Sequence, residues 1–171
     1  MNVLDSFNLK GQRALITGSS AGIGLALAEA LTQAGAHVIL NGRTASKVDA
    51  AAHALQAQGL SVSTSVFDVT DADSVRAAVE QIDAEGPIDI LVNNAGMQIR
   101  GPLHEYADSD WHTIMKTNLD SVYYVGQAVA KKTAAPPRSC TSPQRRLGVR
   151  PTNQLLNVGS STSFWFSSVL K

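Results

Sequence analysis

The 171-residue sequence contains one cysteine, Cys140, and no long apolar run. A single thiol cannot form an internal disulfide or a multi-cysteine zinc site, so we expect an inert thiol and no metal centre. No apolar stretch approaches the ~18 residues that a membrane span needs. Residues 1–10 also lack the basic start and apolar core of a signal peptide. These absences predict a cytoplasmic protein without a membrane partner.

The chain as a whole carries no net charge, with 14 Lys and Arg against 14 Asp and Glu. A neutral chain gives no reason to expect binding to nucleic acid or to an anionic membrane surface. Hydrophobic residues make up 44% of the sequence and charged residues 16%, which is typical of a globular protein rather than a disordered one. The length corresponds to about one domain.

Acidic residues are absent after position 132. Residues 1–132 hold all 14 Asp and Glu, whereas residues 133–171 hold five basic residues and four of the six prolines. Residues 133–171 also show neither a helical nor a strand period. We therefore expect a folded domain over 1–132 and an irregular or disordered basic tail over 133–171. The tail could be an interaction segment, a linker, or a sequence foreign to the fold.

Apolar runs and helical patterns alternate through residues 1–132. The sequence predicts strands at 13–17, 36–40, 61–67 and 88–92, and helices at 25–34, 44–58, 71–85 and 111–132. Parallel strands joined by helical crossovers are the simplest arrangement of such a series. Strands that are apolar throughout indicate helices on both faces of the sheet. The expected fold class is α/β, a Rossmann-like doubly wound parallel sheet.

A glycine-rich turn joins the first predicted strand to the first helix. Gly18 permits the turn out of the strand, Gly22 allows a pyrophosphate to approach the backbone, and Gly24 allows close packing of the helix. The free N–H groups and the dipole of the helix start would then hold the phosphates. The alternative is a glycine loop that only turns the chain, but the strand–helix context favours dinucleotide binding.

The end of the second predicted strand discriminates between the two nicotinamide coenzymes. An acidic residue at this place selects NAD through the ribose 2′-hydroxyl. Here the strand ends Asn41-Gly42-Arg43, and Arg43 can pair with a 2′-phosphate that a carboxylate would repel. The sequence predicts NADP rather than NAD. The alternative is that Arg43 is only a solvated charge, as most arginines are.

Three further motifs follow in order: Asp68-Val69 after the third strand, Asn93-Asn94-Ala95-Gly96 after the fourth, and Thr117-Asn118 in the long helix. Together with the glycine turn, they resemble the short-chain dehydrogenase/reductase family over residues ~7–130. The resemblance implies an NADP-dependent oxidoreductase with a small-molecule substrate, and the enzymes of this family are homo-oligomers.

The resemblance also assigns roles to individual positions. It places at the pyrophosphate Gly18, Ser20, Gly22 and Ile23. It places along the adenine Asp68 and Val69, and from the ribose toward the nicotinamide Asn94, Ala95 and Gly96. Each position has a structural alternative. Asp68 could cap the helix near Thr70, and one of the two asparagines could tie neighbouring strands together.

Asn118 corresponds to the family's catalytic-helix asparagine, which holds a water in the proton relay. The structural alternative is a buried polar side chain satisfied by backbone. In finer detail, the stretches 38–43, 66–70, 86–96 and 125–130 resemble gluconate 5-dehydrogenase and similar sugar-acid reductases. This resemblance implies NADP-linked interconversion of D-gluconate and 5-keto-D-gluconate.

The general base of the family is not evident in this sequence. The family uses a Tyr with a Lys four residues later, and the three tyrosines, Tyr106, Tyr123 and Tyr124, are followed at that spacing by Asp110, Gln127 and Ala128. We therefore expect an incomplete sheet, without the C-terminal strands and catalytic helix, and an inactive chain. The alternative function is a non-catalytic NADP-binding fragment.

A reading-frame shift after about residue 132 would explain the foreign tail. Codons for residues 137–144, read in another frame, can spell Lys-Ile-Val-His-Ile-Ala-Ser. That segment resembles the family's fifth strand, which ends in the catalytic Ser. Because codon degeneracy makes such matches easy, the shift is a hypothesis that the coding DNA would decide.

Overall fold

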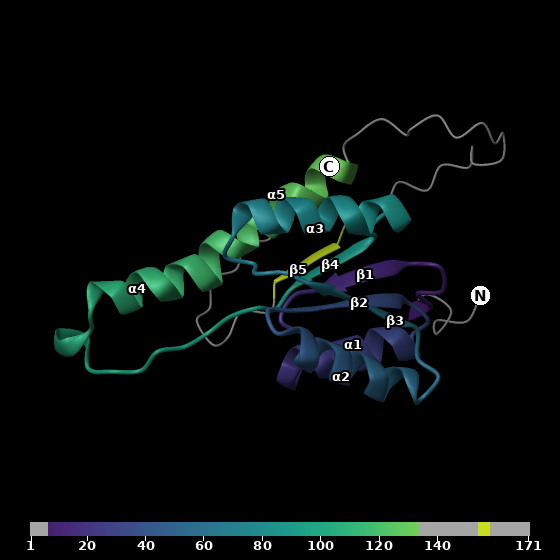
Figure 1. The fold of residues 1–171 in the computed structure, drawn as a ribbon, viewed down its shortest axis with the longest axis horizontal. Helices are drawn as coiled ribbons and strands as arrows, with labels where there is room; N and C mark the ends of the chain where they lie inside the picture. Colours follow the sequence, from purple (N-terminus) through teal and green to yellow (C-terminus); the bar gives the residue numbers. More distant parts are fainter. Residues whose placement is uncertain (1–6, 134–153, 158–171) are drawn as a thin grey trace.

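The computed structural model describes residues 7–133 and 154–157, and shows one parallel sheet with helices on both faces (Figure 1). The sheet has five strands in the order β3-β2-β1-β4-β5. The strands are β1 (Arg13–Ile16), β2 (His37–Gly42), β3 (Val62–Val66), β4 (Ile90–Asn93) and β5 (Gln154–Asn157). Strand order reverses at β1, which pairs with β2 on one side and β4 on the other. The expected doubly wound α/β fold is confirmed.

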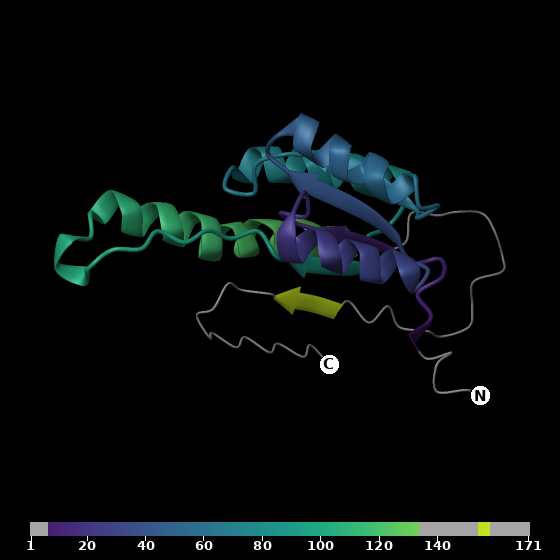
Figure 2. The same ribbon diagram turned by 90° about the horizontal axis from the view of Figure 1, so that it is seen from below.

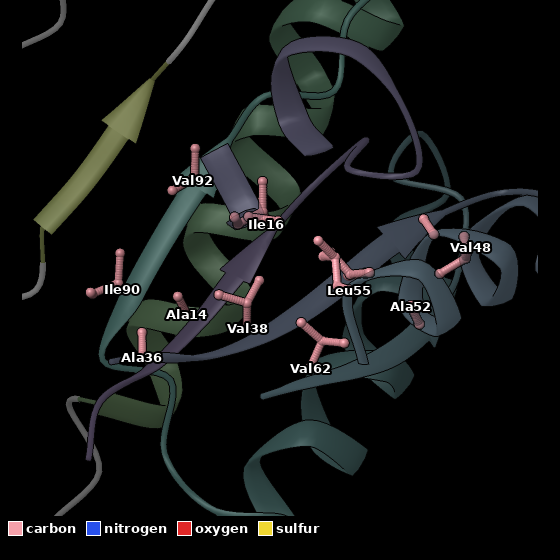
Figure 3. Packing of buried hydrophobic residues seen from close by; sticks show 13 residues of the cluster. Ala14, Ile16, Ala36, Val38, Val48, Ala52, Leu55, Val62, Ile90 and Val92 are labelled. Carbon is pink, nitrogen blue, oxygen red and sulfur yellow. The ribbon is translucent and has the colours of Figure 1, made fainter. Parts of the chain in front are cut away.

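Two apolar layers hold the sheet. Helices α1 (Gly22–Gln33) and α2 (Ala45–Gln56) cover one face, and α3 (Ala72–Glu85) and α5 (Ser121–Thr133) cover the other (Figure 1). Successive residues of a strand point to opposite faces. Accordingly Val38 (Figure 3) and Leu40 of β2 pack with α1 and α2, whereas Ile39 packs with α3 and α5. Burial on both faces explains why the strands are apolar at nearly every position.

Local sequence signals set the ends of several helices. Asp71 caps α3 by accepting hydrogen bonds from the backbone N–H groups of Asp73 and Ser74. Glycines with positive φ, Gly35 (102°) and Gly59 (77°), follow α1 and α2. Glycine adopts this left-handed conformation without the steric cost that a side chain brings. The helix ends at these glycines are therefore as the sequence predicts.

The helix expected over 111–132 is not continuous. It begins earlier, as α4 (Asp108–Met115), and passes through a five-residue π-helical segment, η3 (Lys116–Asp120), before α5. Insertion of a wider turn accommodates a tertiary contact that periodicity does not reveal: the Asn118 side chain bonds to the backbone of Met97. Helix α4 projects beyond the sheet together with the loop that precedes it (Figure 2).

Strand β5 differs from the expectation for residues 133–171. These four residues pair in parallel with β4, Leu91 opposite Leu155 and Asn93 opposite Asn157. The sequence predicts no strand beside β4 on this side, but in the structure β5 pairs with that edge. The sequence of β5, Gln-Leu-Leu-Asn, holds only two apolar residues, too short a run to stand out from a basic, Pro-rich segment. Cys140 and residues 137–144, on which the frame-shift hypothesis rests, lie outside the described residues.

Candidate functional site

The carboxyl ends of β1 to β4 meet at one edge of the sheet, and the motif residues follow these ends. In the phosphate turn after β1, Gly18 and Gly22 have φ values of 63° and 59°, in the left-handed region. A Cβ on Gly24 would lie 2.5 Å from both the Asn94 side-chain nitrogen and the Gly18 carbonyl oxygen. The glycines at 18 and 22 are required by conformation, and the glycine at 24 by close packing.

The start of α1 leaves its N–H groups available to a ligand. Its N-cap residue, Ala21, makes no side-chain hydrogen bond to the helix, and the first turn contains no acidic residue. A Cβ on Gly22 would meet nothing within 4 Å, and Ile23 is exposed. An uncapped helix start carries unpaired N–H donors and a partial positive charge. The turn therefore has the open backbone and the donors that a pyrophosphate needs.

Asn94 ties the end of β4 to the phosphate turn. Its Nδ2 donates to the carbonyl oxygens of Thr17 and Gly18, both at 3.0 Å. In return, the Thr17 hydroxyl accepts from the backbone N–H groups of Asn94 and Ala95, also at 3.0 Å. The structural alternative for this motif is confirmed for Asn94, which links neighbouring strands. Ala95 and Gly96 follow it at the same edge, with Gly96 exposed.

Asn41 makes the corresponding link on the other side of β1. This side chain is 1% exposed. Its Oδ1 accepts from the Gly18 N–H at 3.2 Å, and its Nδ2 donates to Ser65 and Phe67 carbonyl oxygens at 3.1 and 3.2 Å. The Ser19 hydroxyl accepts from the Asn41 N–H at 2.9 Å. Asn41 thus joins the ends of three strands, a role that sequence reasoning missed although the buried asparagine in an apolar strand was visible.

Arg43 is exposed directly after β2, where the sequence predicts the 2′-phosphate contact. A Cβ at position 42 would lie 3.4 Å from the Ser20 hydroxyl oxygen. Because Gly42 has no side chain, the space beside this hydroxyl stays open. Lys116, in η3, and Arg43 both act electrostatically on Asp68. Two cations therefore flank this corner of the site, and Lys116 is a residue that no sequence motif singled out.

Asp68 is half-buried after β3. Burial acts to raise the pKa of this carboxyl, but the hydrogen bonds from Thr70 and the charges of Arg43 and Lys116 outweigh it, so the pKa lies below its ordinary value. Oδ1 accepts from the Thr70 N–H and hydroxyl, both at 2.8 Å. Among the described residues, nothing donates to Oδ2. The cap of α3 is Asp71, so Asp68 binds Thr70 without capping the helix. Val69 beside it is buried.

Asn118 lies in the π-helical segment and faces the loop after β4. Its Oδ1 accepts from the Met97 N–H at 2.8 Å, and its Nδ2 donates to the Met97 carbonyl oxygen at 2.9 Å. The side chain is half-buried, and each of its two polar atoms bonds to backbone. The contact also fixes the loop that continues from the Asn94-Ala95-Gly96 motif.

None of the three tyrosines lies in the phosphate turn or in the motifs that follow β2, β3 and β4. Tyr123 and Tyr124 lie on α5 with their rings edge to face, centroids 6.0 Å apart. Tyr106 donates from its hydroxyl to the Ile99 carbonyl oxygen at 2.5 Å. Over residues 7–133 and 154–157, no helix is long and apolar enough to cross a membrane, and no three His, Cys, Asp or Glu side chains gather as metal ligands.

Comparison with known proteins agrees with this geometry. The profile of the short chain dehydrogenase family matches residues 12–138. Gluconate 5-dehydrogenase of Gluconobacter oxydans is 54% identical over 128 residues, which are 74% of this chain and 50% of that enzyme. The crystal structure of a gluconate 5-dehydrogenase from Burkholderia cenocepacia, in complex with NADP and tartrate, superposes with a TM-score of 0.74 at 47% identity, over 77% of this chain and 52% of that one.

A further relative matches part of the tail. The 3-oxoacyl-[acyl-carrier-protein] reductase of Haemophilus influenzae is 40% identical over 153 residues, 89% of this chain and 56% of that enzyme. Residues 1–132 are too few to hold this match, so it extends into 133–171. The chain spans about half the length of the relatives it matches. Its motifs, its sheet and the family profile agree, and the chain belongs to the short-chain dehydrogenase family.

Proposed function

We propose that the chain binds NADP(H) and forms the coenzyme-binding part of an oxidoreductase acting on a sugar acid, with D-gluconate and 5-keto-D-gluconate as the first candidate pair. The observation that carries the proposal is the uncapped start of α1 behind the open turn at Gly22. NADP, when bound, supplies the carbon that accepts or donates a hydride. The substrate class is supported by the 54% identity to a gluconate 5-dehydrogenase.

The residues present fit the coenzyme. The backbone from Gly18 to Ile23 would hold the pyrophosphate through N–H groups and the helix dipole. Arg43 would pair with the 2′-phosphate, and it has no neighbouring carboxylate at position 42 to oppose it. The exposed adenine edge would lie along Asp68 and Val69, where the Oδ2 atom of Asp68 can accept from an exocyclic amine.

Asn94 and Asn118 would act on the coenzyme indirectly. Their amides are committed to backbone partners in the phosphate turn and in the loop after β4. Each side chain therefore fixes the position of a segment that would border the ribose and the nicotinamide. For Asn118, the side chain holds the loop, and one Oδ1 lone pair and one Nδ2 hydrogen are left over with which it could bind a water.

The second candidate function is NADP(H) binding without turnover. It is favoured by one observation: no tyrosine of the 171 residues has a Lys four positions later. The Tyr–Lys pair is the general base of the family, and these 171 residues do not contain it. Two observations oppose the frame-shift hypothesis: residues 154–157 pair with β4 as β5, and one relative matches beyond residue 132.

A turnover assay separates the two candidates. The purified chain is incubated with NADP and D-gluconate, and in the reverse direction with NADPH and 5-keto-D-gluconate, while coenzyme absorbance is followed. Protein from a gene with the frame restored after codon 132 is the control. Turnover by the chain itself supports the dehydrogenase. Coenzyme binding with turnover only in the control supports the binding fragment, and no coenzyme binding contradicts both.

A further inference from the structure

The glycine at position 42 is required by space and not by backbone conformation. Its φ lies outside the left-handed region that Gly18 and Gly22 occupy. A side chain is therefore compatible with its backbone. An ideal Cβ, however, would lie 2.9 Å from Cγ2 of Val48, a distance that real Cβ atoms essentially never show. The next contacts, 3.4 and 3.6 Å to the Ser20 side chain, are much less severe. Val48 is the principal obstacle.

Val48 cannot move aside easily. It lies one turn into α2 and is 0% exposed, in the apolar cluster that also contains Val38, Ala52 and Leu55 (Figure 3). A β-branched side chain in a helix has essentially one favoured χ1 rotamer. Protein interiors are close-packed, so a displaced methyl group has no void to enter. The clash at position 42 is therefore imposed by the core beneath the coenzyme site.

Position 42 is the end of β2, where an acidic side chain would select NAD by accepting from the ribose 2′-hydroxyl. A carboxylate there needs a Cβ first. We propose that Val48 determines coenzyme choice from within the core, by excluding every side chain from position 42 and so keeping the 2′-phosphate pocket free of a carboxylate. This inference rests on the proposed NADP(H) binding. It makes Val48 a positioning residue, because it acts through Gly42 and touches no coenzyme.

The inference predicts that Gly42→Asp alone cannot convert the chain to NADH binding, whereas Gly42→Asp with Val48→Ala can. Binding of NADH and NADPH to the full chain is measured by fluorescence titration for the wild type, both single variants and the double variant. A charged hydrogen bond contributes enough for about a tenfold to hundredfold change in Kd. We expect at least about a tenfold tighter NADH Kd for the double variant than for Gly42→Asp. Equal Kd values would overturn the inference.

Gly42→Asp with Val75→Ala is the matched control, since Val75 is equally buried in the other apolar cluster. It should bind NADH no better than Gly42→Asp. If this control bound NADH more tightly than Gly42→Asp, the inference would also be overturned. That result would show that loosening the core at any site is enough to permit NADH binding. If Val48→Ala does not fold by circular dichroism, Val48→Cys, with one γ atom in place of two, replaces it.

A second readout needs no coenzyme. Gly42→Ala adds only the Cβ, and its effect on the urea midpoint is measured in the wild-type background and in the Val48→Ala background. The inference predicts a clear drop in the wild-type background and a much smaller one when Val48 has been shortened; equal drops would refute the clash. Failure of the wild type to bind NADPH would instead refute the proposed function, and the claim about coenzyme choice with it.

Discussion

Replacing Asn41 by Leu tests whether the ends of the strands are held together as described. The substitution keeps the size of the side chain but removes its three hydrogen bonds, to Gly18, Ser65 and Phe67. The net contribution of such a bond is about 0.5–1.5 kcal/mol. We therefore expect the free energy of unfolding to fall by about 1.5–4.5 kcal/mol, a large share of the roughly 5–15 kcal/mol of a typical domain.

The assay is urea unfolding followed by circular dichroism at constant pH. Asn8→Leu is the control, because the Asn8 side chain accepts a single hydrogen bond, from the Lys10 N–H, at an exposed site. We expect it to change the free energy of unfolding by less than about 0.5 kcal/mol. Asn41→Asp adds a buried charge and removes both donors, so it should destabilise at least as much as Asn41→Leu. If Asn41→Leu is as stable as the control, the reasoning about this amide is refuted.

Three further predictions concern other parts of the chain. Arg43→Ala should raise the Kd for NADPH about 10- to 100-fold and leave the Kd for NADH nearly unchanged, by fluorescence titration; an equal rise for both coenzymes would contradict the 2′-phosphate contact. Gly24→Ala should lower the urea midpoint more than Gly22→Ala, because its Cβ would lie 2.5 Å from two atoms whereas a Cβ at 22 meets nothing within 4 Å; the reverse order would show that conformation outweighs packing. Burial, and then repulsion from Arg13, hold the pKa of His37 below its ordinary value of 6.5. The contribution of neutral His37 to stability is thus present above about pH 6.5 and falls as the pH drops below it. Unfolding measured for the wild type and His37→Gln at about pH 7.5 and about pH 5.5 should show a smaller difference at the lower pH, and an unchanged difference would contradict this titration.

The regular part of the fold follows from local patterns. Apolar strands, helix periods and glycine stops occur in the order that a doubly wound sheet requires, and burial on both faces produces those patterns. The cap at Asp71 and the stops at Gly35 and Gly59 are local too, which is why the helix ends near them were predictable.

The features that the sequence did not reveal depend on contacts between distant segments. The π-helical segment exists where Asn118 reaches Met97, and no helical period records that bond. Strand β5 is defined by its pairing with β4, while its surroundings are dominated by basic, Pro-rich composition. Its two consecutive leucines are fewer than the three apolar residues that marked each of β1 and β4.

In the candidate site, too, local features were predictable from the sequence and contacts between distant segments were not. The glycines of the phosphate turn are set by backbone geometry, so Gly18 and Gly22 were recognisable from spacing alone. The partners of Asn41 and Asn94 are carbonyl and N–H groups more than twenty residues away, which spacing cannot identify. For Asn94 the sequence left two interpretations open, and the structure shows the hydrogen bonds by which it ties neighbouring strands together.

The central claim is that the described part of the chain binds NADP(H) through the phosphate turn and Arg43. Titration of the purified 171-residue protein with NADPH and, separately, with NADH tests it most directly. We predict saturable NADPH binding that is at least about tenfold tighter than NADH binding. A folded, soluble protein that binds neither coenzyme, or that prefers NADH, would contradict the account.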